Sequence, residues 1–266
     1  MEPMNHPDPG NIYLISYPRS GSNWFRYCAE FITKRRTQTR ENCWNTGASE
    51  AIPELIYHLH DINEYNMNTK RGANIPQIIL IRDYKECISS HASRAGYVWW
   101  VRKFYAHLGK IPGAVDPVSA LYLKRYCDLI NEFEKSRHTC PSLLIHYEAL
   151  QALPERELTG FINYIDAIRS QLTHAVPTAE QMKANLQELM KEYAHHRREC
   201  LSAYRGESPG TLCSGAAASS KENTTVLRYY CRYYSEWEIK RMEKFVYNSV
   251  SESVYKKHLA VYEERQ

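Results

Sequence analysis

The chain has 266 residues, a formal charge of +4, 43% hydrophobic and 24% charged residues, an ordinary composition for a globular protein able to bury a sizeable core. This mild positive charge suits an anionic small ligand but is too weak to indicate a nucleic-acid-binding protein. The eight cysteines form no C-x-x-C pair and no His/Cys spacing of a zinc site, so we expect no metal.

The first ten residues, MEPMNHPDPG, form a lead that lacks the basic and apolar regions of a signal peptide. No run approaches the roughly 18 apolar residues from which a membrane-spanning helix is predicted. We therefore expect a cytoplasmic protein with neither a membrane nor a nucleic-acid partner. The sequence leaves a homodimer open.

Short apolar runs alternate with helical patterns along the chain. The predicted strands are Asn11–Tyr17, Glu54–Asp61 at a sheet edge, Gln77–Ile81 and Ser142–His146. The predicted helices are Ser22–Arg36, Tyr84–Ser93, Pro117–Ser136, Glu155–Ser170, Thr178–Arg198 and a last helical stretch around 226–250.

This alternation predicts an α/β fold, in which a central parallel sheet has helices on both faces and forms a three-layer sandwich. We expect residues 11–266 to form a single domain. Residues 206–225 are rich in glycine, serine and alanine, which indicates a mobile loop rather than a linker. Ligands of such sheets bind beyond the carboxyl ends of the strands, so the motifs at those ends are the candidate site.

The stretch YPRSGSNW follows the first predicted strand and opens the next helix. The first N–H groups of a helix lack partners and its dipole is positive there, so anions bind at this position. Gly21 permits close backbone approach, Ser20, Ser22 and Asn23 add donors, and Arg19 adds a fixed charge. An ordinary strand–helix turn is the alternative. The stretch is not a Walker A loop, because the G-x-x-x-x-G-K-[ST] pattern is missing.

This stretch resembles the 5′-phosphosulfate loop of sulfotransferases that use 3′-phosphoadenosine 5′-phosphosulfate (PAPS), whose usual form is Tyr-Pro-Lys-Ser-Gly-Thr-Thr-Trp. Arg19 stands in place of the lysine, and Ser22 and Asn23 replace the two threonines. The resemblance, to cytosolic and bacterial members, implies their P-loop-like fold. It also implies PAPS as cosubstrate, 3′-phosphoadenosine 5′-phosphate (PAP) as product, and no metal.

Two further motifs resemble the family's nucleotide contacts. In RDYKECISS, Arg82 and Ser90 have the spacing of the pair that holds the 3′-phosphate. In IHYEAL, Tyr147 matches the tyrosine beside the adenine, and the resemblance implies that Trp24 flanks the base from the other side. Either aromatic residue could instead belong to the core.

The family's late Arg-Lys-Gly-x-x-Gly loop, which closes over the 3′-phosphate, has a loose counterpart in YRGESPG. This segment offers Arg205, Gly206 and Gly210, but it lacks the lysine.

Sulfuryl transfer needs a base to take the proton of the acceptor, and histidine suits that role because its pKa lies near neutral. The family places this histidine in a Lys-Thr-His segment upstream of the 3′-phosphate arginine. YHLHD offers His58 and His60; we favour His60, which lies 22 residues before Arg82. His58 is the alternative, and a third option is that both are structural. Arg19 would polarise the bridging oxygen.

The resemblance therefore implies a sulfotransferase that moves a sulfuryl group from PAPS to a hydroxyl or amine of a small-molecule or glycan acceptor. The aromatic stretch 95–109 either lines the acceptor pocket or packs on the sheet. Two other functions remain open: a nucleotide or small-molecule kinase with a degenerate phosphate loop, and a non-catalytic module that binds a 3′-phosphonucleotide.

Overall fold

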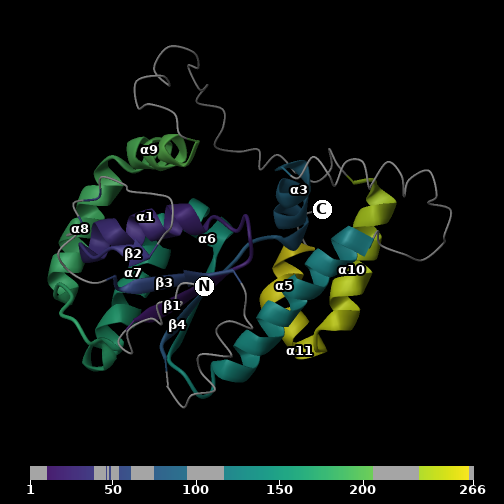
Figure 1. Ribbon diagram of the computed structural model, residues 1–266, viewed down its shortest axis with the longest axis horizontal. Coiled ribbons are helices and arrows are strands. Elements are labelled where there is room, and N and C mark those ends of the chain that lie inside the picture. Colours follow the sequence, from purple (N-terminus) through teal and green to yellow (C-terminus); the bar gives the residue numbers. More distant parts are fainter. Residues whose placement is uncertain are drawn as a thin grey trace, which may run out of the picture. The chain divides into compact units, whose positions relative to one another are not determined.

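The computed structural model describes residues 11–38, 46, 48, 54–60, 75–94, 117–205 and 234–263. Its centre is a five-stranded sheet in the order β2-β3-β1-β4-β5 (Figure 1). The strands are β1 (Ile12–Ser16), β2 (Thr37–Gln38), β3 (Ile56–Leu59), β4 (Gln77–Ile81) and β5 (Ser142–His146). β1 pairs in parallel with β3 and β4, and β2 pairs in parallel with β3. The predicted α/β class with a parallel sheet is confirmed.

Among the described elements, one helix lies between β1 and β2, two lie between β4 and β5, and the others follow β5. The helices are α1 (Ser22–Thr33), α3 (Tyr84–Arg94), α5 (Pro117–Ser136), α6 (Tyr147–Ala152), α7 (Pro154–Ala167), α8 (Ala179–Lys191), α9 (Tyr193–Arg205), α10 (Glu236–Ser249) and α11 (Glu252–Val254). Short turns are η1 (Arg169–Gln171), η4 (Tyr255–Leu259) and η5 (Ala260–Tyr262).

The predicted bounds of β4, α5 and β5 are those observed, but three predictions were wrong in detail. β3 is not at an edge, because it lies between β2 and β1. α1 ends at Thr33, since Lys34 turns left-handed with φ 52°. The helix predicted from Thr178 to Arg198 is two helices, because Glu192 leaves the helical conformation at φ −123°. The 1–10 lead, the 95–109 stretch and the 206–225 loop lie outside the described residues.

The chain divides into two compact units. The first unit comprises Met1–Ser16, Gly21–Leu80 and Cys140–Thr225, and the second comprises Tyr17–Ser20, Ile81–Thr139 and Val226–Gln266. We describe each unit by itself, and the single domain expected from the sequence stays a prediction.

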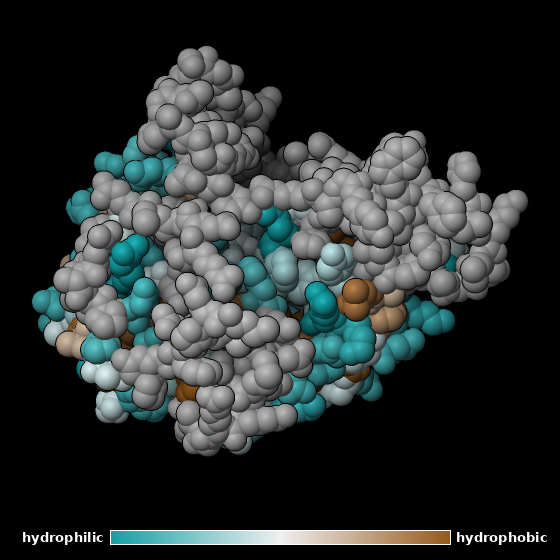
Figure 2. All heavy atoms as spheres, viewed as in Figure 1, coloured by the Kyte–Doolittle hydropathy of each residue, from teal (hydrophilic) through white to brown (hydrophobic). Residues whose placement is uncertain are grey.

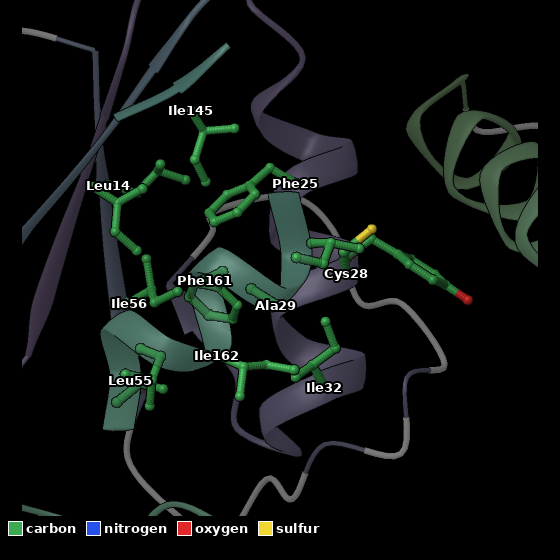
Figure 3. Close-up of a cluster of buried hydrophobic side chains, with 14 of the residues drawn as sticks. Leu14, Phe25, Cys28, Ala29, Ile32, Leu55, Ile56, Ile145, Phe161 and Ile162 are labelled. Atoms are coloured by element: carbon green, nitrogen blue, oxygen red, sulfur yellow. The ribbon is translucent and has the colours of Figure 1, made fainter. Parts of the chain in front are cut away.

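The core of the first unit lies between one face of the sheet and the helices α1, α7 and α8 (Figure 3). Successive strand residues point to opposite faces, and Leu14 belongs to the face that meets Phe25 and Phe161. The two phenylalanine rings pack edge to face at 5.4 Å. Side chains of the opposite face, such as Ile15, are also fully buried. Burial on both sides is expected of a parallel sheet.

The second unit is built on helices α3, α5 and α10, of which α5 and α10 pack side by side (Figure 1). The side chain of Lys85, on α3, is buried where this helix meets α10 and η5. Its Nζ donates to Glu243 Oε1 at 3.2 Å and to the Tyr262 carbonyl oxygen at 3.0 Å. One buried ammonium group therefore ties α3 to α10 and to η5.

Most of the described surface seen in Figure 2 is hydrophilic, with scattered hydrophobic residues. The large hydrophobic side chains that are exposed in the described part are Leu121, Leu153, Trp237, Tyr247 and Val261. In that same part, every helix is too short or too polar to cross a bilayer.

Candidate functional site

The N-terminus of helix α1 has no side-chain cap. Gly21 is its N-cap residue, with φ 88° and ψ 19°, and no side chain caps the helix. The first turn carries no acidic residue, and Ser22 and Asn23 occupy its first two positions. The amides of this turn and the positive end of the helix dipole can therefore receive an anion.

The ring of Tyr147 packs directly against Gly21. A Cβ atom at position 21 would come within 3.0 Å of Tyr147 Cζ and would overlap Cδ2 and Cε2. The Tyr147 hydroxyl accepts a hydrogen bond from Gln151 Nε2 at 2.8 Å, which fixes the ring on α6. The structure thus places Tyr147 at the start of α1, and its contact with an adenine stays a prediction.

Trp24 is buried in the core of the first unit, with 5% of its surface exposed. Its ring stacks on Tyr27, and its Nε1 donates to the Tyr193 hydroxyl at 3.0 Å. That hydroxyl in turn donates to the Leu150 carbonyl oxygen at 3.3 Å. Tyr193, which sequence reasoning missed, therefore links α1 to α6. The role of Trp24 beside the base stays a prediction.

The two candidate histidines lie at the carboxyl end of β3, the strand that pairs with β1. Their rings are 4.4 Å apart. His58 Nε2 lies 2.8 Å from Ser16 Oγ, and His60 Nδ1 donates to the Ser16 carbonyl oxygen at 2.9 Å. His58 is half-buried, whereas the side chain of His60 reaches the surface.

The surroundings of both imidazoles favour the neutral form. Desolvation is the main cause that lowers the pKa of His58 well below its usual value, and the charges of His60 and Arg26 add to it. Desolvation also lowers the pKa of His60, an effect that the Ser16 carbonyl opposes and Arg26 reinforces. A neutral imidazole can accept a proton, which is what a general base must do.

Arg26 is a buried cation that the sequence motifs did not single out. Its Nε donates to Thr37 Oγ1 at 3.0 Å, and its Nη1 lies 3.5 Å from Asn23 Oδ1. Burial lowers the pKa of Arg26 to about 10, while the charge of Glu30 opposes that shift. An arginine and a glutamate four residues apart within an apolar helix were the available signal.

The second unit brings three predicted residues together. Arg19, which has φ 72°, donates from Nε to Ser90 Oγ at 3.1 Å. Arg82 Nη1 donates to the Arg19 carbonyl oxygen at 3.1 Å, and Arg82 Nη2 is 3.6 Å from Glu86 Oε2. Ser20 closes the preceding turn, because its Oγ donates to the Tyr17 carbonyl oxygen at 2.6 Å. Two guanidinium groups beside a hydroxyl suit a phosphate ligand.

The remaining predicted residues belong to the late YRGESPG segment. Arg205 is the last residue of α9, and Gly206 and Gly210 lie outside the described part. Within that part, no three His, Cys, Asp or Glu side chains group as metal ligands would.

No protein-family model matches the sequence, and a comparison with curated proteins finds no match. A solved structure does match. The crystal structure of mouse sulfotransferase SULT7A1 complexed with PAP has a TM-score of 0.50 and 15% identity to this chain. The match covers 93% of this chain and 88% of the mouse chain. This chain has the sulfotransferase fold. At such low identity the match shows the fold alone, so any argument about the reaction must come from the site residues.

Proposed function

We propose that the protein is a sulfotransferase that transfers a sulfuryl group from PAPS to a hydroxyl or amine of a small-molecule or glycan acceptor. The observation that carries the proposal is the pairing, in the first unit, of an uncapped helix start with two neutral imidazoles at the end of the neighbouring strand. An anion site beside a proton acceptor is what sulfuryl transfer to a hydroxyl needs.

The residues present fit the donor. In the first unit, the uncapped amides at Gly21, Ser22 and Asn23 would bind the 5′-phosphosulfate. In the second unit, Arg82 and Ser90 would bind the 3′-phosphate. PAPS, when bound, would supply the activated sulfuryl group.

In this proposal His60 is the general base and takes the proton of the acceptor at Nε2. His60 is favoured over His58 because it is the more exposed of the two and can meet an acceptor that enters from solvent. Arg19 would stabilise the charge that develops on the bridging oxygen. Because the pKa of His60 is lowered, the acidic limb of the pH profile of kcat/KM should lie below pH 6.5.

The test is transfer of labelled sulfate from PAPS across a panel of alcohols, phenols, sugars and amines. His60→Ala should abolish transfer and leave the Kd for PAP nearly unchanged. If His60→Ala keeps full turnover and His58→Ala does not, the choice of base is wrong. If the folded wild-type protein transfers sulfate to none of these acceptors, catalysis itself is not supported.

Calorimetric titrations with PAP, ATP and ATP–Mg²⁺ test the donor separately. We expect binding of PAP without metal and much weaker binding of ATP. Tight binding of ATP that depends on Mg²⁺ would instead favour the kinase alternative.

A further inference from the structure

Ser16 contacts both candidate histidines through two different groups. It is the last residue of β1 and is fully buried. Its carbonyl oxygen lies 2.9 Å from His60 Nδ1, and its hydroxyl oxygen lies 2.8 Å from His58 Nε2. The hydroxyl is also 3.4 Å from His60 Nδ1. The protons shared among these four atoms can be assigned one by one.

The contact with the carbonyl fixes the tautomer of His60. A carbonyl oxygen can only accept a hydrogen bond, so His60 Nδ1 must carry the proton that it donates to Ser16. The lone pair of the neutral ring is then on Nε2. Within the part of the chain that the structure describes, that nitrogen has no hydrogen-bond partner.

The tautomer of His60 also determines the tautomer of His58. Since His60 Nδ1 is protonated, it cannot accept the hydroxyl proton of Ser16. The remaining acceptor among the described residues is His58 Nε2, so the hydroxyl donates to it. The Nε2 lone pair of His58 is therefore occupied, and its proton is on Nδ1.

We propose that Ser16 is the positioning residue of the histidine pair: its carbonyl leaves Nε2 of His60 open as the base, and its hydroxyl occupies Nε2 of His58. The word "base" here rests on the proposed function, whereas the tautomers do not. When His60 takes the acceptor's proton at Nε2, its Nδ1–H still donates to Ser16, and that bond becomes charge-assisted. Among the residues that the structure describes, Arg26 is the charged side chain that acts on both rings.

The tautomers can be read by long-range ¹H–¹⁵N spectra of the full chain labelled at histidine, above pH 7. Signals are assigned by loss in His58→Gln and His60→Gln. We expect both rings to be protonated at Nδ1, with a shielded, hydrogen-bonded Nε2 in His58 and an unbonded Nε2 in His60. An Nε2–H tautomer of His60 would overturn the proposal.

Ser16→Ala removes the hydroxyl and keeps the carbonyl. The His58 Nε2 signal should move to the unbonded position while His60 stays protonated at Nδ1. We expect kcat to fall about tenfold with KM for PAPS nearly unchanged. The half-buried His58 Nε2 loses its donor, and the ring can then reorient against His60. Ser16→Thr, which retains a hydroxyl, should restore both the signal and kcat.

A double variant separates this role from general damage to the fold. If the hydroxyl acts through His58, adding Ser16→Ala to His58→Gln should cause no further loss of kcat. Fully additive losses, or an unmoved His58 signal in Ser16→Ala, would overturn the proposal. If the predicted tautomers are found but no acceptor is sulfated, the positioning role stands and the proposed function fails.

Discussion

Replacing Gly21 by alanine should destabilise the protein at the start of α1, for two separate reasons. Gly21 has φ 88°, a left-handed conformation that L-residues rarely adopt. An added Cβ would also overlap the ring of Tyr147. Backbone strain and steric overlap therefore act at the same position.

The magnitude follows from these two terms. Holding alanine in the left-handed region costs about 1–2 kcal/mol. Moving the Tyr147 ring, which is fixed by its hydrogen bond from Gln151, costs about 1–3 kcal/mol, as in other overpacked sites. We therefore expect Gly21→Ala to lower the free energy of unfolding by about 2–5 kcal/mol.

Urea unfolding followed by circular dichroism measures this loss, provided that the slope with denaturant is unchanged. Gly160 in α7 gives a matched control, because a Cβ there meets nothing within 4 Å. Gly160→Ala should stabilise the protein by about 0.5–1 kcal/mol. Combining Gly21→Ala with Tyr147→Ala should remove the overlap, so the two losses should not add. A loss below about 1 kcal/mol for Gly21→Ala, or simple additivity, would refute the close packing.

Three further predictions address the second unit, the pH dependence of stability and the donor. Lys85→Met should lower the free energy of unfolding by about 3 kcal/mol, because it leaves the largely buried carboxylate of Glu243 without its partner. Lys240→Met, in an exposed pair, should change this free energy little. Equal effects of the two substitutions would contradict the burial of Lys85. The pKa of His58 is lowered below the 6.5 of the unfolded chain, so stability should be complete above pH 6.5 and fall as the pH drops through it. His58→Gln should flatten that dependence in urea unfolding between pH 5 and 7.5; an unchanged slope would contradict it. Arg82→Ala should weaken PAP binding about 10–100-fold in calorimetry but barely alter the affinity of an analogue without the 3′-phosphate, and an equal loss for both ligands would argue against that assignment.

Local signals in the sequence predicted most elements, and tertiary contacts explain the rest. The apolar run of β4 ends at Ile81, just before the charged Arg82, and α5 begins with Pro117 at a position where proline favours a helix start. The place of β3 inside the sheet depends on its pairing with β1 and β2, which no property of its own residues encodes. The break after α8 has no glycine or proline nearby; it lies beside Tyr193, whose hydrogen bonds run to Trp24 and Leu150.

The candidate site divides in the same way. Arg19 and Gly21 could be recognised because a phosphate-binding turn is a contiguous pattern. The roles of His58 and His60 could not be separated, because residues two apart in a strand share a face and carry the same chemistry. What distinguishes them is Ser16, more than forty residues earlier in the chain, which offers a carbonyl to one ring and a hydroxyl to the other. A carbonyl only accepts, whereas a hydroxyl can also donate, so a single neighbour leaves the Nε2 lone pair free in His60 and occupied in His58.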